Sequence, residues 1–196
     1  MPVADLLARH AGAWGRATRS PFLDAVRDGT LPAAAFDTWL VQDARFVGDL
    51  LRFQARLLAR APRAAQPVLA AGCVALVEEL AWFEEQAADR GLDLDRPALP
   101  ATESYARLLE RLDGAAVPAA LTALWAIERA YLDAWSSALP GAPAYREFVA
   151  HWTVPGFAAY VTGLEEAVDA AGPPDEAAFL EVTGAEEAFW RTALDA

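Results

Sequence analysis

An acid stands among apolar residues in the stretch "FDTWLVQDARFV". Asp43 follows Phe36 by seven positions and Leu40 by three, and it precedes Phe46 by three and Val47 by four. Residues at these spacings lie on one face of a helix. The sequence therefore predicts that the carboxyl of Asp43 points toward the core, where acidic side chains are rare.

The same spacing places two further acids on apolar faces. Glu128 follows Leu124 by four positions and precedes Tyr131 by three, in "LTALWAIERAYLDAW". Glu186 follows Val182 by four, in "FLEVTGAEEAFW". We therefore expect three carboxyls from three separate helices to face the interior.

A fourth acid shows the pattern more weakly. Glu79 lies three after Leu76 and four before Phe83, and its neighbour Glu78 shares part of that face. The spacing alone predicts that one of the two glutamates faces inward and leaves open which one.

Interior carboxyls at this spacing favour a binding or catalytic site. A single acid at the edge of an apolar stripe can extend to water, so any one of them could be structural. Several acids on separate helices are harder to explain in that way, because an unpaired buried carboxylate costs several kcal/mol. Clustered acids also raise one another's pKa, which lets one carboxyl act as an acid and another as a base. Such a cluster suits a cationic or hydrogen-bond-donating ligand.

Other site chemistries fit the sequence less well. A di-iron carboxylate site uses Glu-x-x-His pairs, whereas Glu147 and His151 are one residue too far apart and His10 is the only other histidine. His10 could in principle hold haem. Cys73 has no histidine nearby in sequence, so we expect a small buried residue rather than a nucleophile. No glycine-rich phosphate loop is present.

The elements that must position these acids are helices. Apolar residues recur every three or four positions, and the sequence predicts about eight helices and no strand. Ser20 should begin one helix that Gly29 ends, Thr102 should begin another that Gly114 ends, and Gly91 should end a third. The expected helices run from about 2 to 18, 21 to 28, 32 to 60, 64 to 90, 102 to 113 and 118 to 139, followed by two that meet near 155 and one from 175 to the end.

Length and composition indicate one all-α domain over residues 1–196, a single helical bundle with a large core. Hydrophobic residues make up 55% of the chain, and seven are Trp. The net charge of −12 disfavours nucleic-acid binding, which depends on clustered Lys and Arg. No signal peptide or membrane span is expected, and the lone cysteine suits a reducing compartment. We expect a soluble, cytoplasmic protein that binds neither nucleic acid nor membrane.

Four stretches together resemble the TenA family, also called thiaminase II, whose fold is similar to that of haem oxygenase. They are "FDTWLVQDARFV", "TESYARLL", "LWAIERAYLDAW" and "AEEAFW", which occur in the family's order and span essentially the whole chain. The resemblance implies an all-α homodimer or homotetramer without organic cofactor or metal. It also implies hydrolysis of the aminomethyl group of a thiamine-derived aminopyrimidine, which releases ammonia and hydroxymethylpyrimidine for salvage.

The resemblance also implies roles for individual residues. Asp43 would bind the amino group and a nitrogen of the pyrimidine ring, and Glu186 would donate or accept a proton at the exocyclic position. Tyr105 would line the pocket and Phe189 would form an aromatic wall. Aromatic side chains that could wall a flat heterocycle also include Tyr160, although most aromatic residues of the chain should belong to the core.

This chain departs from the best-known family members at two places. Phe46 stands where they have a tyrosine, and no cysteine lies near Ile127 and Glu128, where theirs provides a nucleophile. Both features resemble a cysteine-less branch that has glutamates in the site and acts on degraded or formylated pyrimidines. We expect Glu128 and Glu186 to share the roles of general acid and general base. Asp43 would anchor the ring, with Glu79, Phe46, Tyr105, Tyr160 and Phe189 around it.

Two other classes of function stay open from the sequence. Members of the resembled family have been called transcriptional activators, so a non-catalytic protein that binds a metabolite is one alternative. A related oxidase on the same fold is another, although the scarcity of histidine disfavours a metal-dependent one.

Overall fold

A computed structural model describes residues 2–194, and over that range the chain forms ten α-helices and no strand. The helices are α1 (Ala4–Arg9), α2 (Ala11–Thr18), α3 (Pro21–Asp28), α4 (Ala33–Arg60), α5 (Gln66–Arg90), α6 (Pro100–Asp113), α7 (Val117–Ser137), α8 (Arg146–His151), α9 (Pro155–Ala171) and α10 (Glu176–Thr192). The expectation of an all-α bundle is confirmed.

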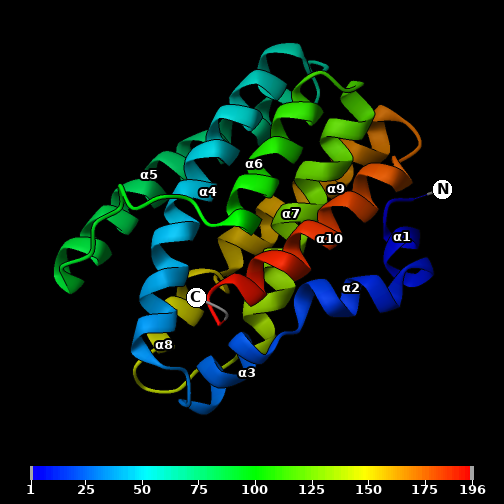
Figure 1. Cartoon of the computed structure of the whole chain (residues 1–196). Helices are drawn as coiled ribbons and strands as arrows, with labels where there is room; N and C mark the ends of the chain where they lie inside the picture. The colour runs from blue at the N-terminus through cyan, green and yellow to red at the C-terminus, as the bar shows by residue number, and fades with distance from the viewer. Residues whose placement is uncertain (1, 195–196) are drawn as a thin grey trace.

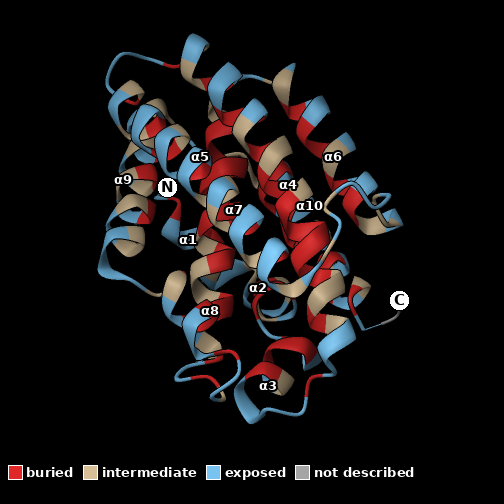
Figure 2. Ribbon diagram, turned by 90° about the vertical axis from the view of Figure 1, so that its left-hand side faces the viewer, coloured by how far each residue is buried: buried red, intermediate tan, exposed pale blue. Residues whose placement is uncertain are grey.

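The long helices run side by side, with α3 and α8 at one end of the bundle and α1 and α2 along its side next to α10 (Figure 1). α4 and α5 form an antiparallel pair, and α7 lies inside the bundle against α4, α9 and α10. The buried faces of α4, α7 and α10 are turned toward each other (Figure 2). The three clearest acids on apolar stripes belong to these three helices.

Local sequence signals set several helix ends as expected. The side chain of Ser20 accepts a hydrogen bond from the backbone N–H of Leu23 at the start of α3. Gly29 and Gly91 take the left-handed conformation that ends α3 and α5, with φ of 75° and 67°. Asp175 caps α10 by accepting from the N–H of Ala178.

The first predicted helix is wrong in its extent. The chain leaves the helical conformation at His10 (φ −111°, ψ 33°) and begins again as α2. At that point the ring of His10 lies 2.5 Å from Oε1 of Glu176 and 5.9 Å from the ring of Phe179. These contacts with α10 are tertiary, so helical periodicity could not reveal the break.

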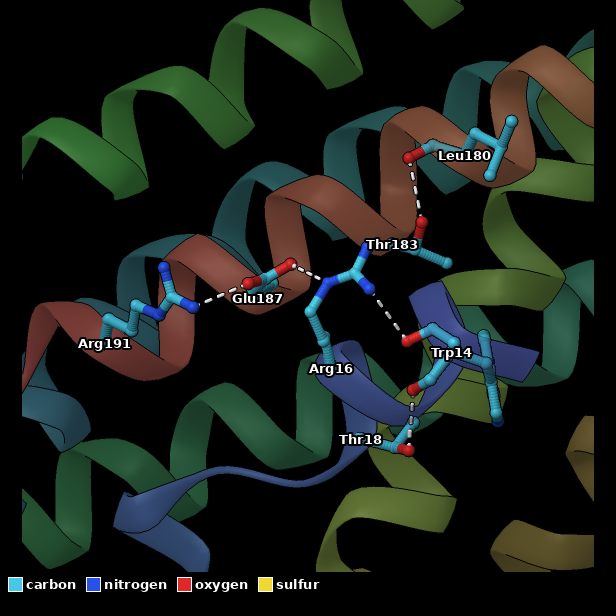
Figure 3. Close-up of polar contacts among 8 residues, drawn as sticks. Trp14, Arg16, Thr18, Leu180, Thr183, Glu187 and Arg191 are labelled. Atoms are coloured by element: carbon cyan, nitrogen blue, oxygen red, sulfur yellow. Dashed lines mark hydrogen bonds and ion pairs between the residues drawn. The ribbon is translucent and has the colours of Figure 1, made fainter. Parts of the chain in front are cut away.

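On the outer faces of the helices, acidic side chains form ion pairs with arginine. Glu187 of α10 lies between Arg16 of α2, at 2.9 Å, and Arg191 one turn further along α10, at 2.6 Å (Figure 3). Trp14 packs beneath them, 5.5 Å from the ring of Phe179. The Arg16–Glu187 ion pair and the Trp14–Phe179 ring contact hold α2 against α10.

α5 is the least covered of the long helices. Val74 and Val77 are 60% and 56% exposed on its outer face. By length and composition α5 could cross a membrane, but it carries Glu78 and Glu79 and packs along α4. An apolar outer face of this kind also suits contact with another protein chain.

Candidate functional site

The four acids, here called the interior acids (Asp43, Glu79, Glu128 and Glu186), converge between α4, α5, α7 and α10. A cavity of about 20 Å³ lies next to Glu79 and Glu128, whereas Asp43 and Glu186 do not line it. Its walls are Phe46, Val47, Leu50, Leu76, Glu79, Ile127, Glu128, Tyr131, Trp152 and Phe157. This volume is about that of one water molecule, so a heterocyclic ligand must displace some of the walls.

Asp43 is fully buried on α4. The hydroxyl of Tyr131 on α7 donates to Oδ2 at 2.5 Å, whereas Oδ1 has no hydrogen-bond partner among the described residues. Burial raises the pKa of Asp43 well above its ordinary value, and the Tyr131 hydrogen bond opposes the rise. A buried acceptor without a donor is costly, so Oδ1 is suited to a ligand that brings one.

Gln42, next to Asp43, hydrogen-bonds to the start of α6, which carries part of the site. Its Oε1 accepts from the backbone N–H of Leu99 and from the hydroxyl of Thr102, both at 2.8 Å. Its Nε2 donates to the carbonyl of Pro97 at 3.2 Å. The prediction that Thr102 caps this helix is wrong, because α6 begins at Pro100 and the Thr102 hydroxyl is engaged by Gln42.

Gln42 thereby fixes α6 at the level where Tyr105 enters the site. The hydroxyl of Tyr105 donates to Oε1 of Glu186 at 2.5 Å, and both side chains are buried. Burial raises the pKa of Glu186 to about 8, and the hydrogen bond from Tyr105 opposes the rise.

Two of the expected aromatic residues surround that pair. The ring of Phe46 lies 4.5 Å from the ring of Tyr105 and 5.6 Å from the ring of Phe189. Phe189 meets Tyr105 edge to face at 6.2 Å. Phe46, Tyr105 and Phe189 thus form one apolar wall next to Glu186, and a phenylalanine at 46 adds no hydroxyl to it.

Glu128 of α7 and Glu79 of α5 both line the cavity. Glu79 is the member of its pair that faces inward, since Glu78 is exposed. The indole N–H of Trp152 donates to Oε1 of Glu79 at 2.8 Å. Burial raises the pKa of Glu79 to about 7. Burial, then the charges of Glu79 and Glu186, raise the pKa of Glu128 to about 8.

Within the described part of the chain, no arginine or histidine forms an ion pair with any interior acid. Their partners are instead neutral donors, which include Tyr131, Tyr105 and Trp152. Nor do residues 2–194 hold three or more His, Cys, Asp or Glu side chains in a group that could bind a metal ion. The arrangement can bind a cationic or donor-rich ligand and exchange protons with it.

Sequence reasoning missed three polar contributors, namely Gln42, Gln54 and Trp152. Gln54 could have been found, since it lies four after Leu50 and three before Leu57 on the same apolar stripe of α4. Trp152 follows α8 directly, and no spacing relates it to Glu79. Cys73, expected to be buried, is half-buried on α5.

Comparison with known protein families matches residues 7–196 to the TENA/THI-4/PQQC family. A protein of Glycine max described as a bifunctional TENA-E protein is 32% identical over 171 residues, which cover 81% of this chain and 75% of the relative.

Solved structures give the same result for the fold. A TenA homologue from Pyrococcus furiosus is 29% identical and superposes with a TM-score of 0.91, covering 97% of this chain and 98% of its own. A TenA-like thiaminase from Sulfolobus solfataricus reaches a TM-score of 0.87 at 17% identity, covering 98% and 95%. A TenA family transcription regulator from Silicibacter reaches 0.89 at 18%, covering 98% and 96%. At such low identity the last two show the fold alone.

Proposed function

The chain belongs to the TENA/THI-4/PQQC family, and from this membership we propose that it is a thiaminase-like hydrolase of thiamine salvage. Its substrate would be an aminopyrimidine that carries an aminomethyl or formylaminomethyl group, and its product would be hydroxymethylpyrimidine. The family and its TenA relatives support a thiamine-related role, and the site geometry supports this reaction.

One observation carries the proposal, namely the buried Oδ1 of Asp43, which lacks a partner in the described structure. A protonated aminopyrimidine presents a ring N–H beside an exocyclic amino N–H. These two donors match the two oxygens of one carboxylate, an arrangement that binds strongly when it is charge-assisted. Neutralising the buried carboxylate in this way would also remove its desolvation cost.

Glu128 and Glu186 would carry out the chemistry on the aminomethyl group. One carboxylate takes a proton from water, whose oxygen forms a bond to the exocyclic methylene carbon. The C–N bond breaks with its electron pair moving to nitrogen, which takes a proton from the other carboxyl and leaves as ammonia from the aminomethyl substrate or as formamide from the formylaminomethyl one. The two mutually repelling glutamates favour a state with one proton between them, as this reaction requires.

The cavity must widen before a ring can bind. Phe157 is half-buried at the start of α9, close to the exposed Val154. Movement of these residues would enlarge the cavity without disturbing the buried wall of Phe46, Tyr105 and Phe189. We therefore propose that Glu79, Tyr160 and this wall close around the ring after it enters.

The test is hydrolysis by the purified protein. Aminomethyl-aminopyrimidine, its N-formyl derivative and thiamine are incubated with it separately, and ammonia and hydroxymethylpyrimidine are quantified. We expect turnover of one or both pyrimidines and little of thiamine. Asp43→Asn, Glu128→Gln and Glu186→Gln are the controls that link turnover to this site. Absence of hydroxymethylpyrimidine from all three substrates would refute the enzyme, and binding without turnover would favour a metabolite-binding regulator.

We also propose that the protein is a soluble, cytoplasmic homodimer or homotetramer that uses the exposed face of α5. Val74 and Val77 would be covered by a second copy of the chain. Light scattering should give a multiple of 21.0 kDa. Val77→Glu should reduce that mass, and a wild-type protein that is monomeric at micromolar concentration would refute the assembly.

A further inference from the structure

Glu79 differs from the other interior acids in its access to solvent. Asp43, Glu128 and Glu186 are buried, whereas Glu79 keeps part of its surface accessible to solvent. Glu79 also lines the cavity, where Glu128 is the other acid. It is therefore the interior acid that connects the cavity with the outside of the molecule.

Trp152 holds the carboxyl of Glu79 at the cavity. Its indole N–H donates to Oε1 of Glu79 at 2.8 Å. The indole is 3% exposed, stacks on the ring of Trp135 at 4.7 Å and meets the ring of Trp39 edge to face at 5.6 Å. A ring enclosed in this way stays in place, so its hydrogen bond keeps Glu79 from turning toward solvent as the exposed Glu78 does.

The cavity offers acceptors of hydrogen bonds and few donors. Besides the two acids, the polar side chains that line it are Tyr131 and Trp152. Tyr131 gives its proton to Asp43, and Trp152 gives its N–H to Glu79. The other lining residues are apolar, namely Phe46, Val47, Leu50, Leu76, Ile127 and Phe157. An ionised carboxylate only accepts, so the described residues that line the cavity leave no uncommitted donor for a ligand.

This inventory distinguishes the two candidate substituents of the pyrimidine. A protonated aminomethyl group brings a positive charge and three N–H donors, and it contains no acceptor. A formylaminomethyl group is neutral, and its carbonyl oxygen needs a donor that the cavity lacks. The charge of Glu79 also raises the pKa of Glu128, and a cation between the two carboxylates would offset that repulsion.

We propose that Glu79, positioned by Trp152, selects the aminomethyl substrate over its formylaminomethyl counterpart by binding the ammonium group. The selection rests on the proposed hydrolase function. An ammonium group beside two ionised carboxylates holds as many protons as an amine beside one protonated carboxyl. Binding in this form therefore leaves the proton needed for C–N cleavage in place. Trp152 is a positioning residue, because it acts on the ligand only through Glu79.

The test compares Glu79→Gln, Trp152→Phe and the double variant with the wild type. Glu78→Gln is the matched control, since it neutralises the exposed neighbour on the same helix. At pH 8, above the pKa of about 7 of Glu79, kcat/KM is measured for the aminomethyl and the formylaminomethyl pyrimidine. Isothermal titration calorimetry gives the Kd of each compound, and circular dichroism confirms that each variant is folded.

The wild type should bind the aminomethyl compound more tightly than the formyl one. Glu79→Gln should weaken binding and kcat/KM of the aminomethyl compound by about 10–100-fold, as expected for a lost hydrogen bond between charged groups. The formyl compound should lose nothing, because the new amide can donate to its carbonyl. A purely structural defect would weaken both compounds alike, so the ratio between them is the decisive quantity.

Trp152→Phe keeps an aromatic ring and removes the N–H. It should shift the ratio in the same direction by about 3–10-fold, and it should add nothing in the Glu79→Gln background. Glu78→Gln should leave the ratio unchanged. Should Trp152→Phe not fold, one indole N–H resonance in the NMR spectrum must shift in Glu79→Gln and stay in place in Glu78→Gln, or the positioning role is refuted.

The proposal is overturned if the wild type prefers the formyl compound, or if Glu79→Gln changes the ratio no more than Glu78→Gln does. An equal shift by Trp152→Phe with Gln at position 79 would refute the positioning role. Calorimetry needs no turnover. A wild-type protein that binds the aminomethyl compound through Glu79 without hydrolysing it would refute the proposed function and leave the role of Glu79 intact.

Discussion

Glu186 and Glu187 are neighbours on α10, and they differ in every physical respect that bears on function. Glu186 is 1% exposed and takes a hydrogen bond from the phenol of Tyr105. Glu187 points to the other side of the helix, where Arg16 and Arg191 hold it in ion pairs (Figure 3). One helix thus carries a paired surface acid and an interior acid without a cation.

The contrast extends beyond α10. Many surface acids of this protein form ion pairs with arginine. Such exposed pairs stay solvated and change the free energy of unfolding only slightly. The interior acids receive only neutral donors, and they bear a desolvation cost that an apolar residue would avoid. Burial of several acids without a counter-charge is a local conflict with stability of the kind found at functional sites.

Replacing Glu186 and Glu187 separately by glutamine tests the difference between them most directly. Glu186→Gln should lower ammonia release by about 10²–10⁴-fold, the usual contribution of general acid–base catalysis. The same change should raise the melting temperature, because a buried ionisable group is removed. Glu187→Gln is the matched control, and it should leave turnover within about twofold while weakening stability by less than about 1 kcal/mol.

Equal losses of turnover in both variants would show that the effect is structural. Steady-state assays and thermal unfolding of the two proteins, side by side, distinguish these outcomes.

A second comparison concerns binding of the pyrimidine ring. It sets Asp43, the proposed ring anchor, against Asp133, a partly exposed acid of α7. Asp43→Asn replaces an acceptor oxygen by a donor and should lower kcat/KM by roughly 10–150-fold, equal to about 1.5–3 kcal/mol of charged hydrogen bonding. Asp133 accepts from the indole of Trp14 and from Arg129, so Asp133→Asn should lower the melting temperature and spare kcat/KM. Unchanged kcat/KM in Asp43→Asn would remove this residue from substrate binding.

The two classes of acid should also differ in how stability depends on pH. Burial raises the pKa of Glu186 and of Glu128 from 4.5 to about 8. The folded state therefore binds more protons than the unfolded state between those values, and stability must fall as pH rises through this window. Hydrogen bonds from His10 and then Arg9 lower the pKa of Glu176 on the surface, so its contribution is lost as pH falls below 4.5.

Denaturant unfolding between pH 5.5 and 7.5 measures this difference. We expect the free energy of unfolding to drop by on the order of 5 kcal/mol across that range, at about 1.4 kcal/mol per pH unit for each of the two glutamates. The drop should shrink in a Glu128→Gln, Glu186→Gln double variant. A wild-type protein that gains stability over the same range would contradict the raised pKa values.

Much of the candidate site could be predicted because helical periodicity is a local property. The spacing of Asp43, Glu128 and Glu186 was enough to place each on an apolar stripe, and the stripes meet in the bundle. The choice between Glu78 and Glu79 needed the structure, since both lie near the edge of the stripe of α5. The exposure of Glu78 and the hydrogen bond from Trp152 to Glu79 decide it.

Contacts between helices could not be predicted in this way. Thr102 has the residue type of a helix cap, but Gln42 on another helix takes its hydroxyl. Gly72 has no special backbone angle and stands within a helix, so its sequence context suggests only a weak point in α5. Its importance arises from Gln54 of α4 and Tyr160 of α9, which meet directly over it.

The smallest expected effect tests this last point by comparing two helical glycines. A Cβ atom at Gly184, on the exposed side of α10, meets nothing within 4 Å, so Gly184→Ala should stabilise the fold by about 0.5–1 kcal/mol. Gly72→Ala should instead destabilise it by about 1–3 kcal/mol, because the new methyl group collides with Gln54 and Tyr160. Both values come from urea unfolding at constant pH. If Gly72→Ala were stabilising as well, helix propensity alone would govern both sites, and α4, α5 and α9 could not be packed closely enough for Gln54 to reach Tyr160.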